Sequence, residues 1–342
     1  MTQPRRLMIV MYHYVRRIAG SRFPEIKGRE TEDFERQVAY LKRHHQIVTM
    51  EQVIAACDGD VEAVPENAVL LTFDDGYVDH FSDAFPVLQR LGVAGTFFVP
   101  VTAITERKML DVNKVHFLLA SAVGVDSIVE AIDRRVSGAA ADKAAEVHSV
   151  QHYRAAHWAA NRFDSAEVIY AKRMLQHALP DRLRRELLDD LFRQWVASDE
   201  RDFANHLYMS EANLREMTAA GMTIGAHSAN HPWLDRCDIP TQESEIAQSA
   251  AFLAGLGIRQ TQWTFCYPYG AYNSDTLELL LRRGFTLGVT TRVGLAQIPG
   301  DHRLLMPRLD TNDLPILADA APNSWSARLQ QASAGAFPSD ES

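Results

Sequence analysis

Short apolar stretches rich in β-branched and aromatic residues recur along the chain, with helical patterns between them. Near-continuous apolar strands that alternate with helices are typical of a parallel sheet covered on both faces. About seven such strands predict an α/β fold, a distorted (β/α) barrel with its active-site face at the carboxyl ends of the strands. The predicted strands are Leu7–Tyr14, Ala68–Phe73, Gly95–Pro100, Met222–Ala226, Trp263–Tyr267, Phe285–Thr290 and Leu304–Leu309.

Helices are predicted in the connections, where apolar residues recur three to four positions apart. Gly92 and Gly284 each follow such a pattern directly, and glycine favours the left-handed conformation that ends many helices. The predicted helices are Thr31–His44, Asp79–Leu91, Gln242–Leu256 and Asn273–Arg283.

The span from about residue 105 to 205 interrupts this alternation. It is rich in Ala, Arg, Leu and Glu, and its pattern predicts several helices, among them an amphipathic one over Asp181–Trp195. We therefore expect a discontinuous barrel, residues 1–104 and 206–330, with a helical insertion over residues 105–205. The polar end of the chain, residues 331–342, is predicted to be disordered.

The composition of the chain argues against several classes of function. The formal charge of -9 argues against a general nucleic-acid binder, which needs a basic face. No apolar stretch approaches the roughly 20 residues that a membrane helix requires. Three widely spaced cysteines suggest neither a disulfide framework nor a thiolate zinc cluster, and Met1–Val15 lacks a small-residue cleavage site. We expect a cytoplasmic protein without a membrane span.

Two carboxylates stand where the second predicted strand ends, in the sequence Leu71-Thr72-Phe73-Asp74-Asp75-Gly76. The carboxyl end of a barrel strand is where catalytic groups are found, so Asp74 and Asp75 are candidate site residues. The alternative is an Asp-Gly turn in which the other aspartate caps a helix.

Two histidines four residues apart, His227 and His231, follow another apolar strand. Imidazoles at this spacing can converge on one ion from a strand end and the turn after it. Two imidazoles and one carboxylate leave a divalent cation with open positions for water and substrate, which is typical of catalytic zinc. A third strand ends in Phe265-Cys266-Tyr267-Pro268-Tyr269-Gly270, which alone favours a simple β-turn.

Taken together, T-F-D-D-G, H-S-x-x-H and Y-P-Y-G on successive strand ends resemble the polysaccharide deacetylase family, the NodB-homology carbohydrate esterases. The resemblance covers roughly residues 66–104 and 207–310. The first strand, with His13, resembles the subgroup whose last motif has moved to the N-terminus.

The resemblance implies a role for each matching residue. Asp74 is expected to be the general base, and Asp75, His227 and His231 are expected to bind one divalent metal ion. The expected metal is zinc, with cobalt, manganese or nickel as alternatives. His13 is expected to be the general acid, although without the resemblance a packed strand histidine is the better interpretation. A backbone N–H near Tyr269 is expected to stabilise the oxyanion.

One position departs from the family pattern. The arginine that commonly orients the base is replaced by Cys266. Arg308, in the predicted last strand, is our candidate for its substitute, and the alternative is a surface ion pair with Asp310.

These features predict a hydrolase that removes an N-acetyl or N-formyl group from a small amino sugar or nucleotide sugar, in surface polysaccharide or lipopolysaccharide synthesis. The insertion is expected to cover a small substrate, chiefly through Met109–His116, or to pair subunits in a homo-oligomer. Lys108, Lys114 and Arg303 could meet a phosphate or be solvated surface charges. The rival hypotheses are an amidohydrolase acting on a non-sugar amide and an inactive carbohydrate-binding or assembly protein.

Overall fold

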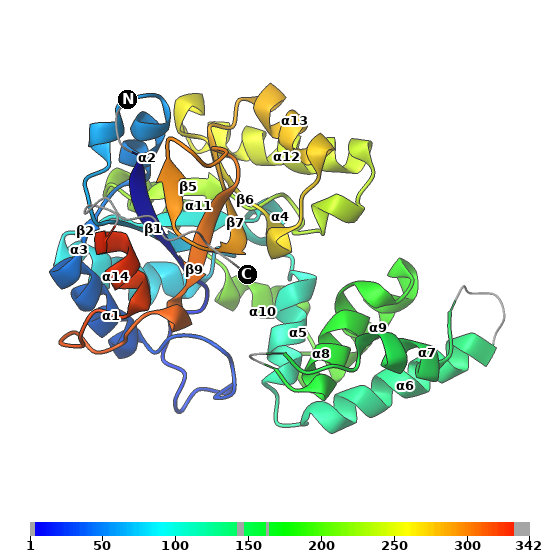
Figure 1. The fold of residues 1–342 in the computed structure, drawn as a ribbon. Coiled ribbons are helices and arrows are strands. Elements are labelled where there is room, and N and C mark those ends of the chain that lie inside the picture. The colour runs from blue at the N-terminus through cyan, green and yellow to red at the C-terminus, as the bar shows by residue number, and fades with distance from the viewer. Residues whose placement is uncertain (1–3, 142–146, 162–163, 332–342) are drawn as a thin grey trace. The chain divides into compact units, whose positions relative to one another are not determined.

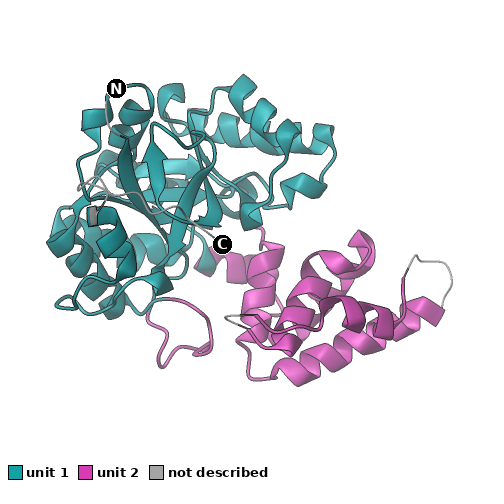
Figure 2. Ribbon diagram, viewed as in Figure 1, with its two compact units in different colours: residues 1–16, 29–107, 207–342 teal, residues 17–28, 108–206 magenta. Residues whose placement is uncertain are grey.

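The computed structural model describes residues 4–141, 147–161 and 164–331. The chain forms two compact units, one comprising residues 1–16, 29–107 and 207–342 and the other residues 17–28 and 108–206 (Figure 2). The second unit thus includes residues 17–28, a segment that the sequence analysis assigned to the barrel. Each unit is described by itself below.

Seven strands of the first unit, all within the described residues, close into a ring in which every neighbouring pair is parallel (Figure 1). The ring runs β3, β4, β5, β6, β7, β9, β1 and returns to β3. The predicted distorted (β/α) barrel is therefore confirmed. The ring strands are β1 (Arg5–Tyr12), β3 (Ala68–Phe73), β4 (Thr96–Val99), β5 (Thr223–Ala226), β6 (Thr264–Cys266), β7 (Leu287–Val293) and β9 (Met306–Asp310).

Two further strands were not predicted. The two-residue β2 (Gln46–Ile47) pairs in parallel with β3, and β8 (Ala296–Ile298) pairs antiparallel with β1. Both are too short to produce a period-two pattern that distinguishes them from a loop.

The four helices predicted in the first unit are present, and α2, α4, α11 and α14 are further helices that were not predicted. The helix predicted over residues 79–91 is divided, because a π-helical turn at His80–Ala84 precedes α3. The helix predicted from Gln242 begins three residues earlier, where the Asp238 carboxylate accepts the Thr241 N–H at 2.9 Å. The helices are α1 (Thr31–His44), α2 (Met50–Cys57), α3 (Phe85–Leu91), α4 (Val101–Thr105), α11 (Glu211–Ala219), α12 (Ile239–Gly255), α13 (Ser274–Arg283) and α14 (Ser324–Gln331).

The expected disordered tail, residues 331–342, lies outside the described residues from 332 onward. Gln331 itself is the last residue of α14, whose buried Leu329 anchors that helix. Among the described residues, no helix combines the length and the apolar character needed to cross a bilayer.

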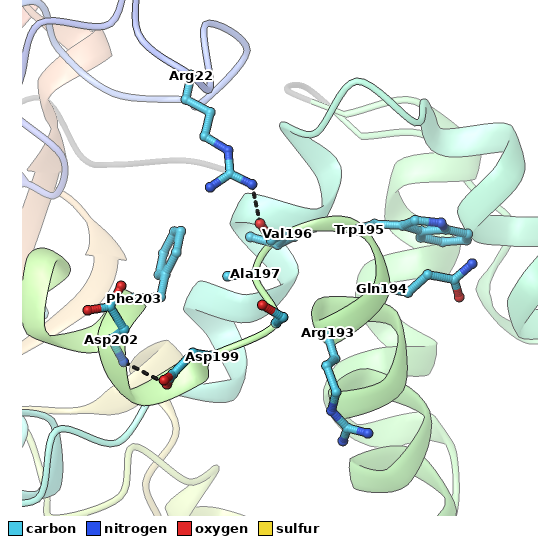
Figure 3. Close-up of a pocket in the computed structure, with 10 residues that line it drawn as sticks. Arg22, Arg193, Gln194, Trp195, Val196, Ala197, Asp199, Asp202 and Phe203 are labelled. Carbon is cyan, nitrogen blue, oxygen red and sulfur yellow. Dashed lines mark hydrogen bonds between the residues drawn. The ribbon is translucent and has the colours of Figure 1, made fainter.

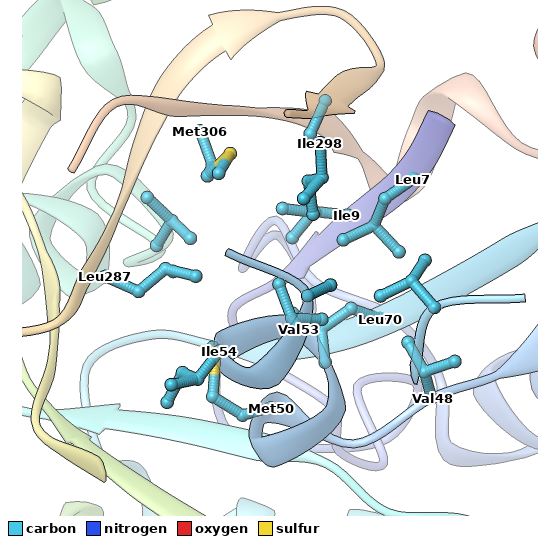
Figure 4. Packing of buried hydrophobic residues seen from close by; sticks show 14 of the residues in the cluster. Leu7, Ile9, Val48, Met50, Val53, Ile54, Leu70, Leu287, Ile298 and Met306 are labelled. Carbon is cyan, nitrogen blue, oxygen red and sulfur yellow. The ribbon is translucent and has the colours of Figure 1, made fainter. Parts of the chain in front are cut away.

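A hydrophobic core fills one part of the barrel. Side chains from seven strands and from α2 pack together there, among them Leu7, Leu70, Val53, Leu287 and Met306 (Figure 4). These residues are at most 1% exposed. Close packing of this kind makes the strand ends a rigid support for the polar side chains that follow them.

Residues 108–206 of the second unit are mainly helical where the structure describes them, as the composition of the insertion predicted, and residues 17–28 contain no helix. A cluster of aromatic rings contributes to its interior, where Phe117 and Phe203 meet edge to face at 4.9 Å and Phe192 and Phe203 at 5.5 Å. The helices are α5 (Asp111–Leu119), α6 (Val125–Ala141), α7 (Val150–His157), α8 (Ala166–Arg173), α9 (Asp181–Trp195) and α10 (Glu200–Leu207).

Lys114 is neither a solvated surface charge nor a phosphate contact, and both expectations for it were wrong. Its side chain is 5% exposed, and its ammonium lies 2.6 Å from Asp189 and 2.7 Å from Glu200. A buried ammonium keeps its charge only when it is paired, so this lysine holds α5, α9 and α10 together. Asp111, at the start of α5, accepts from Arg184 of α9 at 2.6 Å in the same way.

A hollow of about 450 Å³ lies within the second unit, between the end of α9 and the start of α10 (Figure 3). The Arg22 guanidinium donates to the Val196 carbonyl there, and the Asp199 carboxylate accepts the Asp202 N–H at 2.9 Å. Acidic and basic groups both line the hollow, so its charge favours no one class of ligand.

The strands on either side of Gly225 lie so close that a side chain at this position would test how tightly the barrel is packed. A Cβ at this position in β5 would lie 2.6 Å from atoms of Phe98 and Thr264 on the two neighbouring strands. Gly225→Ala is therefore expected to lower the free energy of unfolding by about 1–3 kcal/mol, measured by urea denaturation.

Gly255→Ala is the matched control, because nothing lies within 4 Å of a Cβ at the end of α12. It is expected to be neutral or to stabilise by about 0.5–1 kcal/mol. Equal stability of the two variants would contradict the close strand packing at Gly225.

Candidate metal centre and catalytic site

The candidate residues gather where the barrel strands end. His13 follows the last residue of β1, Asp74 and Asp75 follow β3, and His227 follows β5. Backbone hydrogen bonds extend the ladders past the strand ends, from Asp74 N–H to the Tyr12 carbonyl at 2.9 Å and from His227 N–H to the Val99 carbonyl at 3.1 Å. The strand ends therefore fix the backbone of these residues on one face of the barrel.

Three potential ligand atoms converge on one point. Asp75 Oδ1 lies 3.4 Å from His227 Nε2 and 3.5 Å from His231 Nε2, and the two imidazole nitrogens are 3.2 Å apart. Tetrahedral zinc with bonds of about 2.0–2.1 Å has ligand atoms about 3.3–3.4 Å apart. All three residues are buried. Their chemistry and spacing fit one divalent cation, with at least one position left open.

The neighbours of the two imidazoles set their orientation and charge. His227 Nδ1–H donates to the Cys266 carbonyl oxygen at 2.7 Å, which turns Nε2 towards Asp75 and His231. Burial opposes the charge of His227, but the adjacent Cys266 and Asp75 outweigh burial and raise the pKa of His227 well above its ordinary value, so a cation bound there would displace a proton from Nε2. Burial, together with the neighbouring His227, lowers the pKa of His231 to about 3. His231 is therefore a neutral imidazole, which is the form that binds a metal.

The turn that carries the two histidines is held by side chains. Ser228 and His231 both have φ near 59°, in the left-handed region. Ser228 Oγ accepts the His231 N–H at 2.9 Å, and Glu245 Oε2 accepts the Ala229 and Asn230 N–H groups at 2.8 and 2.7 Å. These bonds satisfy the backbone of a turn in which non-glycine residues adopt an uncommon conformation.

A buried ion pair lies beside this triad. Arg308 Nη1 donates to Asp74 Oδ1 at 2.9 Å and Nη2 donates to Asp74 Oδ2 at 2.8 Å, with 1% and 2% of the side chains exposed. The guanidinium also donates to the Thr290 carbonyl and to Thr72 Oγ1. Two parallel hydrogen bonds to one carboxylate fix both its position and its orientation.

Cys266 completes this arrangement. Its Sγ lies 3.1 Å from Arg308 Nη2 and 3.4 Å from Asp74 Oδ2, in the place where the family pattern carries an arginine. The alternative surface pair between Arg308 and Asp310 is wrong, because Arg308 is buried. The Asp310 carboxylate instead accepts from the backbone and the side chain of Asn312, at 2.8 and 2.7 Å.

The ion pair sets the charge of Asp74. Burial alone would raise the pKa of this carboxyl, but the charge and hydrogen bonds of Arg308 outweigh it and lower the pKa to about 2. Since this value lies below the ordinary value of about 3.9, the pair stabilises the fold above about pH 4 and the contribution is lost as the pH falls towards 2. Asp74 is therefore ionised at neutral pH.

His13 lies at the open side of this pair. Its Nε2 is 4.0 Å from Asp74 Oδ2, and 38% of its side chain is exposed, so it is not a packed core histidine. Its backbone carbonyl accepts a hydrogen bond from Nε2 of the buried His80 at 2.8 Å. The His13 imidazole is therefore open to solvent beside the Asp74 carboxylate.

Tyr269 contacts the candidate ligand His231. Its φ of 58° is left-handed, and its ring meets His231 edge to face at 4.8 Å. Trp233 stacks on the same ring at 4.3 Å with an interplanar angle of 7°. These ring contacts hold the Tyr269 turn next to the candidate ligand His231.

Sequence reasoning missed several residues that support the site. Glu245, Thr72 and Tyr77, whose hydroxyl donates to Asp75 Oδ2, were not singled out. For Tyr77 a signal was available, since it stands two residues after Asp75. Glu245 and Thr72 act through folded contacts that no local pattern indicates.

Comparisons with known proteins agree with this fold. The chain is 21% identical over 295 residues to YxkH of Bacillus subtilis, a protein whose name places it among the polysaccharide deacetylases. The match covers 86% of this chain and 67% of YxkH. Two similar solved structures are IcaB from Ammonifex degensii and the deacetylase PplD of Streptococcus pyogenes in complex with acetate.

The overlap with these structures spans nearly the whole chain. IcaB has a TM-score of 0.55 at 20% identity over 96% of this chain and 98% of IcaB. PplD has a TM-score of 0.54 at 19% identity over 92% of this chain and 94% of PplD. At such identities the likeness establishes the fold. Residues 62–184 and 193–288 match the family described as polysaccharide deacetylase, and this chain belongs to that family.

Proposed function

We propose that this chain is a divalent-metal-dependent hydrolase that removes an N-acetyl group from an amino sugar. The observation that carries the proposal is the convergence of Asp75, His227 and His231 beside an ionised Asp74 in a member of the deacetylase family. Acetyl is favoured over formyl because a similar structure is that of a deacetylase in complex with acetate.

In this proposal Asp75, His227 and His231 hold one cation, with zinc as first choice and cobalt, manganese or nickel as alternatives. Such a cation, when bound, lowers the pKa of a coordinated water and polarises an amide carbonyl. Asp74 then accepts a proton from the attacking water, and Arg308 keeps that acceptor ionised and oriented. Fixed orientation of this kind lowers the entropy lost in reaching the transition state.

The remaining roles follow from position. His13, exposed and 4.0 Å from Asp74, donates a proton to the departing amine. The backbone N–H of Tyr269 faces the negative charge that develops on the carbonyl oxygen. The products are a free amine on the sugar and a carboxylate.

The substrate in this proposal is an acetylated amino sugar or nucleotide sugar in cytoplasmic synthesis of a surface polysaccharide or lipopolysaccharide. The three cysteines, Cys57, Cys237 and Cys266, are all free thiols, which supports a reducing compartment. Residues 105–205 are proposed to contact substrate or to pair subunits. Non-sugar amides are the alternative substrates.

The first test is deacetylation by zinc-loaded protein. The panel is a chitooligosaccharide, a uridine-diphosphate-linked N-acetylated sugar and a simple acetylated aromatic amine, with product detected by mass spectrometry. His231→Ala is expected to lose bound zinc and turnover together. Asp74→Asn is expected to keep zinc and lose about 10²–10⁴-fold in turnover, because the amide cannot accept the proton.

His206→Ala serves as the control, since the His206 side chain is 79% exposed and the neighbouring Asp202 carboxylate is exposed as well. It is expected to match the wild type in zinc content and turnover. Turnover of the aromatic amide alone would exclude sugar specificity, and full zinc occupancy in His231→Ala would exclude this metal centre.

The second test concerns the ion pair. Arg308→Met leaves the Asp74 carboxylate buried without its partner, so the free energy of unfolding is expected to fall by about 3–5 kcal/mol in urea denaturation. Arg292→Met is the control, because Arg292 pairs with Asp301 at the surface of the same barrel, with 60% of its side chain exposed. Its expected loss is at most about 1 kcal/mol. Similar losses in both variants would show that the Arg308 pair is not the buried anchor described above.

A further inference from the structure

The hydroxyl of Tyr77 touches the candidate metal ligand Asp75 directly. It donates a hydrogen bond to Asp75 Oδ2, while the other carboxylate oxygen, Oδ1, is the atom that faces His227 and His231. Tyr77 is fully buried and Asp75 is 2% exposed. One oxygen of the Asp75 carboxylate therefore accepts from the Tyr77 phenol, and the other oxygen faces the candidate metal position.

The backbone imposes this contact. Asp75 and Gly76 have φ values of 74° and 68°, two successive left-handed residues that turn the chain back so that Tyr77 meets Asp75. Beyond the turn, Tyr77 forms an antiparallel bridge with Tyr208, and the Gly76 carbonyl accepts the Met209 N–H at 3.0 Å. The segment that carries Tyr77 is thus held from both ends.

A second tyrosine supports the first. The ring of Tyr14 stacks on Tyr77 with centroids 4.0 Å apart and planes 18° apart, and the two hydroxyls are hydrogen-bonded. Tyr14 is 2% exposed and follows His13 directly. The two stacked rings therefore join the segment of the candidate general acid to that of the candidate metal ligand.

The chemistry of a phenol suits one task at this position. With an ordinary pKa near 10, a phenol keeps its proton at neutral pH and can donate to a carboxylate without carrying charge. A donor on one oxygen stops the carboxylate from rotating and leaves the other oxygen to bind one ion through a single atom. Partners of metal ligands act in this way, and their loss typically weakens metal binding about 10–100-fold.

We propose that Tyr77 is a positioning residue that fixes Asp75 as a one-oxygen ligand, with Tyr14 as its support. This inference rests on the proposed metal centre, and it adds to that centre a residue that does not touch the metal.

The test measures zinc affinity by competition with a chromophoric chelator. Tyr77→Phe keeps the ring and its stacking but removes the donor, and it is expected to weaken zinc binding about 10–100-fold. The cobalt-substituted variant should also show a weaker visible absorption, because a freed carboxylate can bind through both oxygens and raise the coordination number above four. Tyr14→Phe is expected to have a smaller effect of the same sign, since its hydroxyl acts through Tyr77.

Tyr267→Phe is the matched control. Tyr267 is also buried, and its hydroxyl donates to the Leu304 carbonyl at 2.9 Å in the same barrel. This variant loses a comparable hydrogen bond, so it reports any general effect of lower stability on zinc affinity, and it is expected to bind zinc as the wild type does.

The outcomes separate the two proposals. If the wild type binds no zinc, the metal centre itself fails. If the wild type binds zinc and Tyr77→Phe binds it with equal affinity and an unchanged cobalt spectrum, only the positioning role of Tyr77 is overturned. Equal weakening in Tyr77→Phe and Tyr267→Phe would likewise overturn it, because the effect would then be one of stability.

Discussion

Two adjacent carboxylates buried at the end of one strand are the constraint on which this site depends. Neither Asp74 nor Asp75 can remain ionised inside the barrel without a compensating partner, because burial penalises charge. Arg308 compensates Asp74 through two hydrogen bonds. For Asp75, the compensating partners are the facing imidazole nitrogens and the Tyr77 hydroxyl. Two neighbouring residues of the same type therefore have different surroundings, and the proposed roles of the two carboxylates follow from this difference.

The closed ring of strands makes this division possible. β3 supplies the two aspartates, while β1, β5 and β9 supply His13, His227 and Arg308. Because β1 pairs with both β3 and β9, the arginine reaches Asp74 from two strands away. The packed core keeps these strands in register, so the distances between the polar groups are set by the fold rather than by flexible loops.

Local pattern was enough to predict the seven ring strands, the helix Thr31–His44 and the convergence of strand ends. The contacts that orient the site were harder to predict from the sequence. Arg308 was only a candidate, because its pairing with Asp74 spans 234 residues. Lys114 was misjudged, since its partners Asp189 and Glu200 lie in distant helices. Periodicity reports which face a residue occupies and does not report which residue it meets.

The central claim is that a guanidinium beside Asp74 makes this carboxylate an oriented base, whichever strand supplies it. The most direct measurement is the turnover per bound zinc of Arg308→Cys compared with that of the exchange variant Cys266→Arg/Arg308→Cys. The sulfur of Cys266 already lies 3.1 Å from the guanidinium and 3.4 Å from Asp74. We predict that the exchange variant recovers at least about tenfold in turnover, corresponding to about 1.4 kcal/mol of transition-state stabilisation. An exchange variant that folds, binds zinc and is no more active than Arg308→Cys would contradict the claim.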